Sequence, residues 1–192
     1  RYTSRSETGI QATEKIMKGA AIGSLWSTLF ARYLFSEEDF QRTIGIKRGQ
    51  DTLLLAPTIA RARKVAYLED VLYFYVSNPD SVTNRPTVST LSDLIKVRSF
   101  LFEFYRSPRF SAWNDLAPYF YATSLLGLLR IIRRVEKSQG ASDLRDKIHS
   151  ILFSIPIFEI KKGKRLKIFF DILLLRVGLF NAFYSAWESD LL

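Results

Sequence analysis

An acid at the mouth of an apolar segment is the residue of this sequence best suited to chemistry. In RGQDTLLLAPTIARARKVAYLEDVLYFYV, residues 48–76, Asp51 follows a Gly-Gln pair and precedes an apolar run. An aspartate at such a point can cap a helix by accepting hydrogen bonds from the free amides of its first turn. It can also serve as a general base, because a helix N-terminus holds a carboxylate rigidly and keeps it ionised. Taken alone, the pattern favours the cap, and the two roles are compatible.

The residues for several other kinds of catalysis are missing from the sequence. The chain has no cysteine, which excludes a disulfide framework, cysteine-ligated zinc and thiol catalysis. His149 is the only histidine, so a site with several histidines is excluded, and we expect this side chain on a partly exposed helix surface. The P-loop, the Rossmann glycine pattern, the H-E-x-x-H zinc motif and the G-x-S-x-G elbow do not occur.

The composition points to a chain with a sizeable core and an anionic partner. Of the 192 residues, 47% are hydrophobic, and 28 basic against 19 acidic residues give a formal charge of +9. This excess favours phosphate, nucleic acid or an acidic membrane surface, without choosing among them. The first residue is Arg and the only methionine is Met17, so we interpret the chain as processed, truncated or a fragment. Its opening lacks the apolar core of a signal peptide.

The elements expected around Asp51 are two helices and two strands. We predict a helix at 9–18, another after Asp51, and then the short strands KVAYL and VLYFYV, which are rich in Val and Tyr. The helix after Asp51 should bury one face and kink or break at Pro57. The residues predicted on that buried face are Leu54, Leu55, Thr58, Ile59 and Ala62.

From Thr90 onward the pattern is helical almost to the end of the chain. Asp93 is expected in the first turn of the first of these helices, where a carboxylate suits the helix dipole. The first helix is predicted to be capped by Ser89 or Thr90 and to end at Pro108. The second is predicted to stop at Gly140. The third is predicted to be capped by Ser142 and to end at Pro156.

The last segment, residues 161–188, joins a basic cluster to an apolar helix. The cluster is Lys161, Lys162, Lys164, Arg165 and Lys167. Charges interrupt the apolar run before it reaches about 20 residues, so we do not expect a membrane-spanning helix. The remaining wide apolar face suits a helix docked on its neighbours, which is slightly favoured, or one lying at an anionic membrane surface. The polar stripe opposite is predicted to comprise Lys164, Lys167, Asp171, Asn181, Ser185 and Glu188.

Residues 23–84 resemble a known family in the order of several motifs. GSLWSTLFARYLF is similar to a W-x-K-L-F-x-R helix, and GQD is similar to the G-E-D that opens a helix. ARKVAYL, VLYFYV and SVT then match A-K-K-V-x-Y-L, L-Y-x-Y and S-V-T. This order resembles the second half of family 2 glycosyltransferases, whose catalytic domain has the GT-A fold.

The resemblance implies an inverting transfer of a sugar from a nucleotide-sugar to an acceptor hydroxyl, with Asp51 as the general base. It places Trp26 near the acceptor site, although a tryptophan buried under the helix fits the sequence equally well. Gln50 stands beside the base, on the acceptor side, where the family usually has a glutamate. The donor-binding half, with an Asp-x-Asp site for Mg²⁺ or Mn²⁺, would precede Gly9, so this chain alone is expected to be inactive. We interpret the acids of SEEDF and LED as solvated turns.

The sequence therefore predicts an α/β protein that is predominantly helical over this length. Residues 1–88 are expected to form the acceptor-side end of a GT-A-like domain with two short strands, and residues 89–192 a helical extension. The expected partners are a nucleotide-sugar donor and a saccharide or lipid-linked acceptor, in bacterial surface or capsular polysaccharide synthesis. The expected location is the cytoplasm, with peripheral contact to the inner face of the cell membrane through residues 161–188. An exposed edge strand would favour a homo-oligomer.

The alternative prediction is a non-catalytic, basic helical module that binds a membrane surface or nucleic acid. Its support is the formal charge of +9 and the aromatic content of 14%. Nucleic acid is the less favoured partner, because the basic residues are scattered over several helices and the aromatic residues fall largely in apolar runs.

Overall fold

The computed structural model describes residues 5–18, 24–68, 70–74, 76, 78, 80–81, 84–156, 158 and 162–176. Over these residues the chain is predominantly helical with one two-stranded antiparallel sheet, as the sequence predicts. In chain order the elements are β1 (Arg5–Glu7), α1 (Gly9–Met17), η1 (Arg32–Leu34), α2 (Glu37–Gln41), α3 (Gln50–Arg61), β2 (Val65–Tyr67), α4 (Val88–Arg106), η2 (Pro108–Trp113), α5 (Ala117–Ile132), η3 (Arg133–Val135), α6 (Ala141–Ser154) and α7 (Lys162–Arg176).

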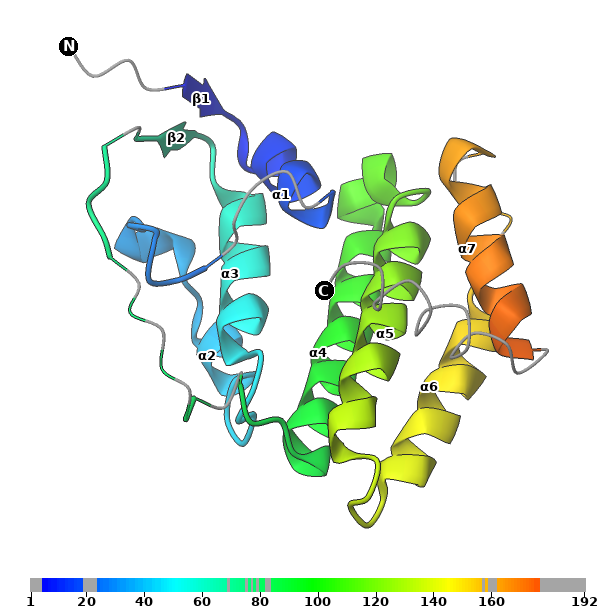
Figure 1. Ribbon diagram of the computed structural model, residues 1–192. Coiled ribbons are helices and arrows are strands. Elements are labelled where there is room, and N and C mark those ends of the chain that lie inside the picture. The colour runs from blue at the N-terminus through cyan, green and yellow to red at the C-terminus, as the bar shows by residue number, and fades with distance from the viewer. Residues whose placement is uncertain are drawn as a thin grey trace.

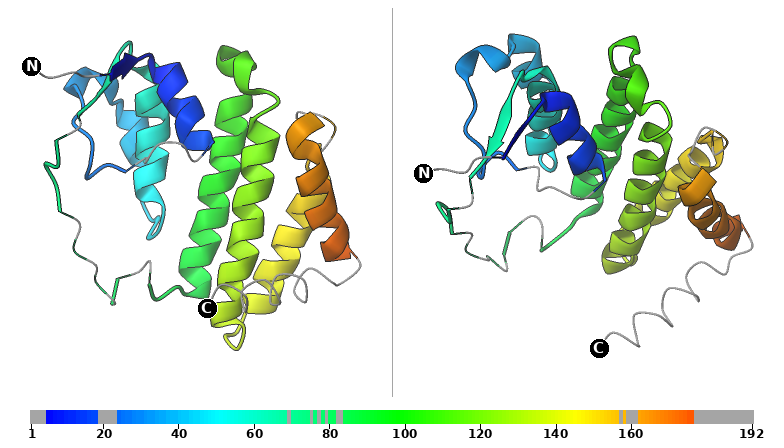
Figure 2. Two further views of the ribbon diagram at one scale, coloured as in Figure 1. Left: turned by 45° about the horizontal axis from the view of Figure 1, so that its top comes forward. Right: turned by 90° about the horizontal axis from the view of Figure 1, so that it is seen from above.

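The helices are arranged in a row that begins at the sheet and ends at α7. From the sheet side, α3, α4, α5 and α6 follow one another across the molecule, with α1 against α3 (Figures 1 and 2). Helix α7 packs on α5 and α6 at the opposite end of the row from β1 and β2. The predicted boundary between residues 88 and 89 falls at the first turn of α4, and Leu53 and Leu94, from either side of it, share one core.

The sheet confirms one predicted strand and corrects the other. The KVAYL strand is present as β2, but its antiparallel partner is β1, with Ser6 opposite Ala66. The described residues of VLYFYV, 71–74 and 76, are not in a strand and are exposed. A strand needs a hydrogen-bonding neighbour, and no described segment pairs with residues 71–74 or 76, because β1 pairs with β2. High β-propensity was therefore insufficient to form the second strand.

Helix α1 confirms the helix predicted at 9–18 and approaches α3 at a glycine. Thr8 caps it in a reciprocal capping box with Gln11. The Gly9 amide donates to the Ala62 carbonyl oxygen at 3.0 Å. A Cβ at Gly9 would overlap the carbonyl oxygen of Ile59 and lie 2.6 Å from that of Ala62, so only glycine allows this backbone approach.

Helix α3 is enclosed on two sides, which corrects the single buried face predicted for it. Leu55, Thr58 and Ile59 are buried as expected, whereas Leu54 and Ala62 are half-buried. The helix also buries Leu53, Ala56, Pro57 and Ala60. Both faces are buried, because Leu53, Ala56 and Ala60 join the core shared with α4, while Leu55 and Ile59 pack with Ala12 of α1. The helix continues through Pro57 instead of breaking there.

In the helical bundle the prolines mark the predicted ends, but the caps lie elsewhere. Helix α4 ends at Arg106, before Pro108, and α6 ends at Ser154, before Pro156. The cap of α4 is Thr87, in a capping box with Thr90, and not Ser89 or Thr90. Gly140 does not end α5. It is the N-cap of α6, with φ of +82°, in place of the predicted Ser142.

Helix α7 corrects the polar stripe predicted for the last segment. Asp171, placed on that stripe, is buried beside Ile168 and Ile172. Leu166 and Phe169, predicted on the apolar face, are exposed instead. Residues 177–188 of the predicted helix, including Asn181, Ser185 and Glu188, lie outside the described residues.

Candidate active site at the start of α3

Gly49 determines where α3 begins. It is the N-cap of the helix, in the left-handed region with φ of +90°, which favours glycine. A Cβ at Gly49 would come within 3.1 Å of the Leu94 Cδ2 and 3.1 Å of the Val97 Cγ2 of α4. Both the backbone angle and the contact with α4 therefore require glycine at this position. The prediction that Asp51 is the N-cap is wrong, because Asp51 is the second residue of the helix.

The loop that leads into α3 is held by a buried acid of α4. The Lys47 amide donates to Asp93 Oδ2 at 2.9 Å, and the Lys96 Nζ lies 3.3 Å from Asp93 Oδ1. Asp93 is buried and is the sixth residue of α4, so the prediction that it lies in the first turn of this helix is wrong. The available signal was its position among buried apolar residues of α4, where a lone carboxylate requires partners.

The Asp51 side chain is exposed on the first turn of α3. The Gly49 carbonyl oxygen accepts from the amides of Thr52 and Leu53, at 3.0 and 3.2 Å, and α3 has no side-chain cap. Within the described part of the chain, the Asp51 carboxylate has neither a hydrogen bond nor an ion pair from a side chain. It is therefore accessible to a substrate and lies where the helix dipole favours an anion.

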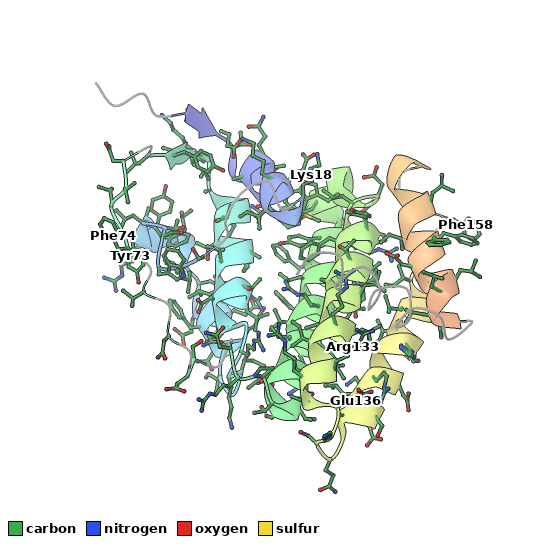
Figure 3. All side chains as sticks on the ribbon, in the orientation of Figure 1. Lys18, Tyr73, Phe74, Arg133, Glu136 and Phe158 are labelled. Atoms are coloured by element: carbon green, nitrogen blue, oxygen red, sulfur yellow. The ribbon has the colours of Figure 1, made fainter. Side chains whose placement is uncertain are left out.

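Trp26 does not belong to the core, so the prediction of a buried tryptophan under the helix is wrong. Its side chain is 43% exposed, and its ring stacks on Tyr73 with a centroid distance of 4.8 Å. Tyr73 and its neighbour Phe74 lie on the side of α3 away from α4 (Figure 3). The two rings are tilted by 31° to one another, and both are exposed.

Leu25, the residue before Trp26 in the chain, packs on the side of α3 that also carries Asp51. Asp51, Leu55 and Ile59 are spaced four residues apart, so they share one helix face. Leu25, next to Trp26, packs against Leu55 and Ile59. These contacts are one to two turns from Asp51, roughly 6 to 12 Å along the helix axis. Gln50 adjoins Asp51 in the chain and is exposed as well.

A buried ionic network connects α2 to the other end of α3. Asp39 is fully buried, accepts a hydrogen bond from Ser36 Oγ at 2.8 Å, and pairs with Arg42 and Arg61. Arg61 also donates to the Leu34 carbonyl oxygen, at 3.0 Å from Nε and 2.7 Å from Nη2. The interpretation of SEEDF as a solvated turn is thus wrong for Asp39, because a chain segment 22 residues away supplies its cation.

The described acids and the histidine do not assemble a metal site. Across the described residues no three potential ligands among His, Cys, Asp and Glu come together. Asp39 and Asp93 are each engaged by cationic side chains. His149 lies half-buried on α6, as its position in the sequence suggested, with its ring 6.2 Å from that of Phe153, and burial lowers its pKa.

No known protein family, curated protein or solved structure matches this chain. Helices of the described residues are either too short or too polar to cross a membrane.

Proposed function

We propose that this chain is the acceptor-side part of a family 2 glycosyltransferase and that Asp51 is its general base. The observation that carries the proposal is the position of the Asp51 carboxylate, exposed on the first turn of α3 while Gly49 occupies the cap. A carboxylate in that position is not needed to begin the helix. It matches the aspartate of the G-E-D motif to which GQD is similar.

The chemistry requires a base because a sugar hydroxyl is a weak nucleophile. As the acceptor oxygen attacks the anomeric carbon of the donor sugar, its proton passes to the Asp51 carboxylate. The bond from the anomeric carbon to the nucleoside diphosphate breaks in the same displacement, so the configuration inverts. The described residues contain no ligand set for Mg²⁺ or Mn²⁺, and no step through a metal is assigned to them.

The Trp26–Tyr73 pair and Gln50 suit contacts to the acceptor. Ligand sites combine aromatic surfaces with a few polar groups that fix the orientation of the ligand. The stacked pair supplies the aromatic surface, and the exposed amide of Gln50 can both donate to and accept from hydroxyl groups. Leu25, which precedes Trp26, packs on the side of α3 that also carries Asp51.

Exposed apolar residues at positions 29, 33 and 71–74 support a neighbour with an apolar face, such as the donor-binding half. Leu29 is 98% exposed and Tyr33 81% exposed, and residues 71–74 are exposed as well. Monomeric proteins rarely leave many large apolar side chains open to water in one region. A donor-binding half of the GT-A kind, added beside β1 and β2, would cover such residues.

The test is sugar transfer by the protein at its native length, with Asp51→Asn compared with Asp143→Asn. Asp143 is a matched control, because it too is an exposed acid in the first turn of a helix whose N-cap is a left-handed glycine. Both variants should unfold at similar denaturant concentrations. Asp51→Asn should reduce the release of nucleoside diphosphate by about 10²- to 10⁴-fold, while Asp143→Asn should leave it unchanged.

Equal activity of the two variants would reject Asp51 as the base. The absence of transfer with every common nucleotide-sugar would instead favour the alternative function, a non-catalytic basic module. If the chain is such a module, neither substitution should affect any transfer reaction.

A further inference from the structure

Helix α7 turns its one acid inward and part of its apolar surface outward. Ile168, Asp171 and Ile172 are buried against the bundle, where α7 packs on α5 and α6. Positions 168, 171 and 172 are spaced by three and four residues, so they define the inner face of the helix. The opposite, outer face is formed by residues that lie between these positions.

The outer face of α7 carries an apolar stripe. Leu166 is 76% exposed, Phe169 54% and Leu173 43%, and these positions follow the spacing i, i+3 and i+7 of a single helix face. Phe170, beside Phe169, is exposed as well. A docked surface helix normally shows the reverse arrangement, with its apolar residues inward and polar residues outward. Leu166, Phe169 and Leu173 together form the α7 stripe.

In the sequence, a basic segment overlaps the start of the α7 stripe. Five of the seven residues 161–167 are Lys or Arg, and the whole chain has a formal charge of +9. The only acid of α7, Asp171, lies on the buried face. In sequence, a strongly basic segment therefore leads into a helix with an exposed apolar face, which is a combination that anionic lipid surfaces attract.

We propose that the α7 stripe binds peripherally to an anionic membrane surface. Penetration is limited to the interface, because no described helix is long and apolar enough to cross a bilayer. The stripe offers roughly 400 Å² of apolar surface, whereas a stable dimer buries about 800 Å² on each partner, so a second copy is the poorer occupant. Charge complementarity selects anionic lipid over a neutral apolar partner. The proposal does not depend on the glycosyltransferase function.

The experiment is sedimentation of the full chain with vesicles. One preparation contains phosphatidylcholine mixed with phosphatidylglycerol, and the other contains phosphatidylcholine alone. The chain should sediment with the anionic vesicles only, and added salt should weaken the binding because it screens the basic cluster. Leu166→Ser and Phe169→Ser should each lower the partition coefficient by about tenfold. Lys162→Gln and Lys164→Gln should each lower it by roughly fivefold.

Leu29→Ser is the matched control for Leu166→Ser. Both replace an exposed leucine by serine, but Leu29 lies between α1 and η1, far from α7 in the chain. The control should bind vesicles as the unchanged chain does, and the thermal unfolding midpoints of all variants should agree. Three results would overturn the proposal: no binding to anionic vesicles, equal binding to both preparations, or the same loss for Leu29→Ser as for Leu166→Ser. A mass that falls from dimer to monomer on Leu166→Ser would overturn it in favour of a second copy.

Discussion

Gly49 packs against Val97 of α4 so closely that a Cβ on the glycine would lie 3.1 Å from the valine Cγ2. This contact joins the loop before α3 to the middle of α4, and the left-handed backbone of Gly49 ends the loop there. Asp51 follows two residues later. The position of the proposed base is therefore set by packing between α3 and α4 together with a backbone angle that only glycine adopts readily.

Replacing Gly49 by alanine should cost more stability than the same change at Gly45. Both glycines have positive φ, +90° and +77°, so each substitution carries about 1 to 2 kcal/mol of backbone strain. A Cβ at Gly45 meets nothing within 4 Å, whereas one at Gly49 crowds Leu94 and Val97. Urea unfolding should therefore rank Gly49→Ala as the less stable variant. Equal stabilities would show that α4 yields to the added methyl group without cost.

Gly9→Ala should be among the most destabilising single methyl additions in the chain. The new Cβ would overlap the backbone carbonyl oxygen of Ile59, which cannot rotate away as a side chain can. We expect a loss of about 3 kcal/mol of unfolding free energy, and separation of α1 from α3. The control is Gly127→Ala in α5, where the Cβ meets nothing within 4 Å and the helix should gain about 0.5 to 1 kcal/mol. A loss of stability at Gly127 that matched the loss at Gly9 would contradict this account.

Asp39→Asn should destabilise the protein by about 1 to 3 kcal/mol, because the buried carboxylate that accepts from Arg61 and Ser36 is replaced by a neutral amide, while the partly exposed Arg61 guanidinium keeps some hydration. Glu38→Gln is the neighbouring control. Glu38 is exposed and pairs with Arg42 at the surface, so its loss should cost about 0.5 kcal/mol or less. Chemical denaturation of the three proteins at neutral pH measures both differences, and a cost for Asp39→Asn no larger than that for Glu38→Gln would refute the role of the network.

The same network predicts a pH dependence. Burial alone would raise the pKa of Asp39, but hydrogen bonds from Arg61 and Ser36 outweigh it and hold the pKa below its ordinary value. A carboxyl whose pKa is lowered by folding adds stability above its unfolded pKa of about 3.9. That stability is lost as the pH falls through the lower folded pKa. Denaturation curves between neutral and acidic pH should thus fall more steeply for the unchanged protein than for Asp39→Asn.

Tyr67 should ionise only in strongly alkaline solution. Burial and its hydrogen bond to Glu7 raise the pKa of Tyr67 to about 12. A group whose pKa is raised by folding adds stability below its unfolded pKa, about 10, and loses it as the pH rises through the folded value. Burial also raises the pKa of Tyr105 and of Tyr121, so several tyrosines should titrate late. In an absorbance titration of phenolate, Tyr67→Phe should therefore remove one late-titrating group, and Glu7→Gln should shift one such group to lower pH. A wild-type titration that ended near pH 10 would contradict the contact between β1 and β2.

Several features could be predicted from local sequence because their causes lie within a few residues. The helix at 9–18 follows from apolar periodicity and the Thr8–Gln11 box, and the ends of α4 and α6 from prolines that cannot continue a helix. The apolar run after Asp51 likewise predicts an acid at the start of a helix, although the cap itself is Gly49. Its neighbour Gln50 followed from the resemblance of GQD to a family motif, and the amide is exposed as an acceptor contact requires.

Other features depended on partners that are distant in the chain, and packing alone decided them. Asp39 pairs with Arg61 as well as with the nearby Arg42, and Asp93 accepts a hydrogen bond from the Lys47 amide. Arg61 and Lys47 are 22 and 46 residues away in the chain, so the sequence around each acid could not identify these partners. The segment at 71–76 has the composition of a strand but no strand beside it, since β1 pairs with β2. The orientation of α7 also depended on packing between distant segments. A periodic pattern identifies two faces of a helix, but only the surface against which the helix packs determines which face is turned inward.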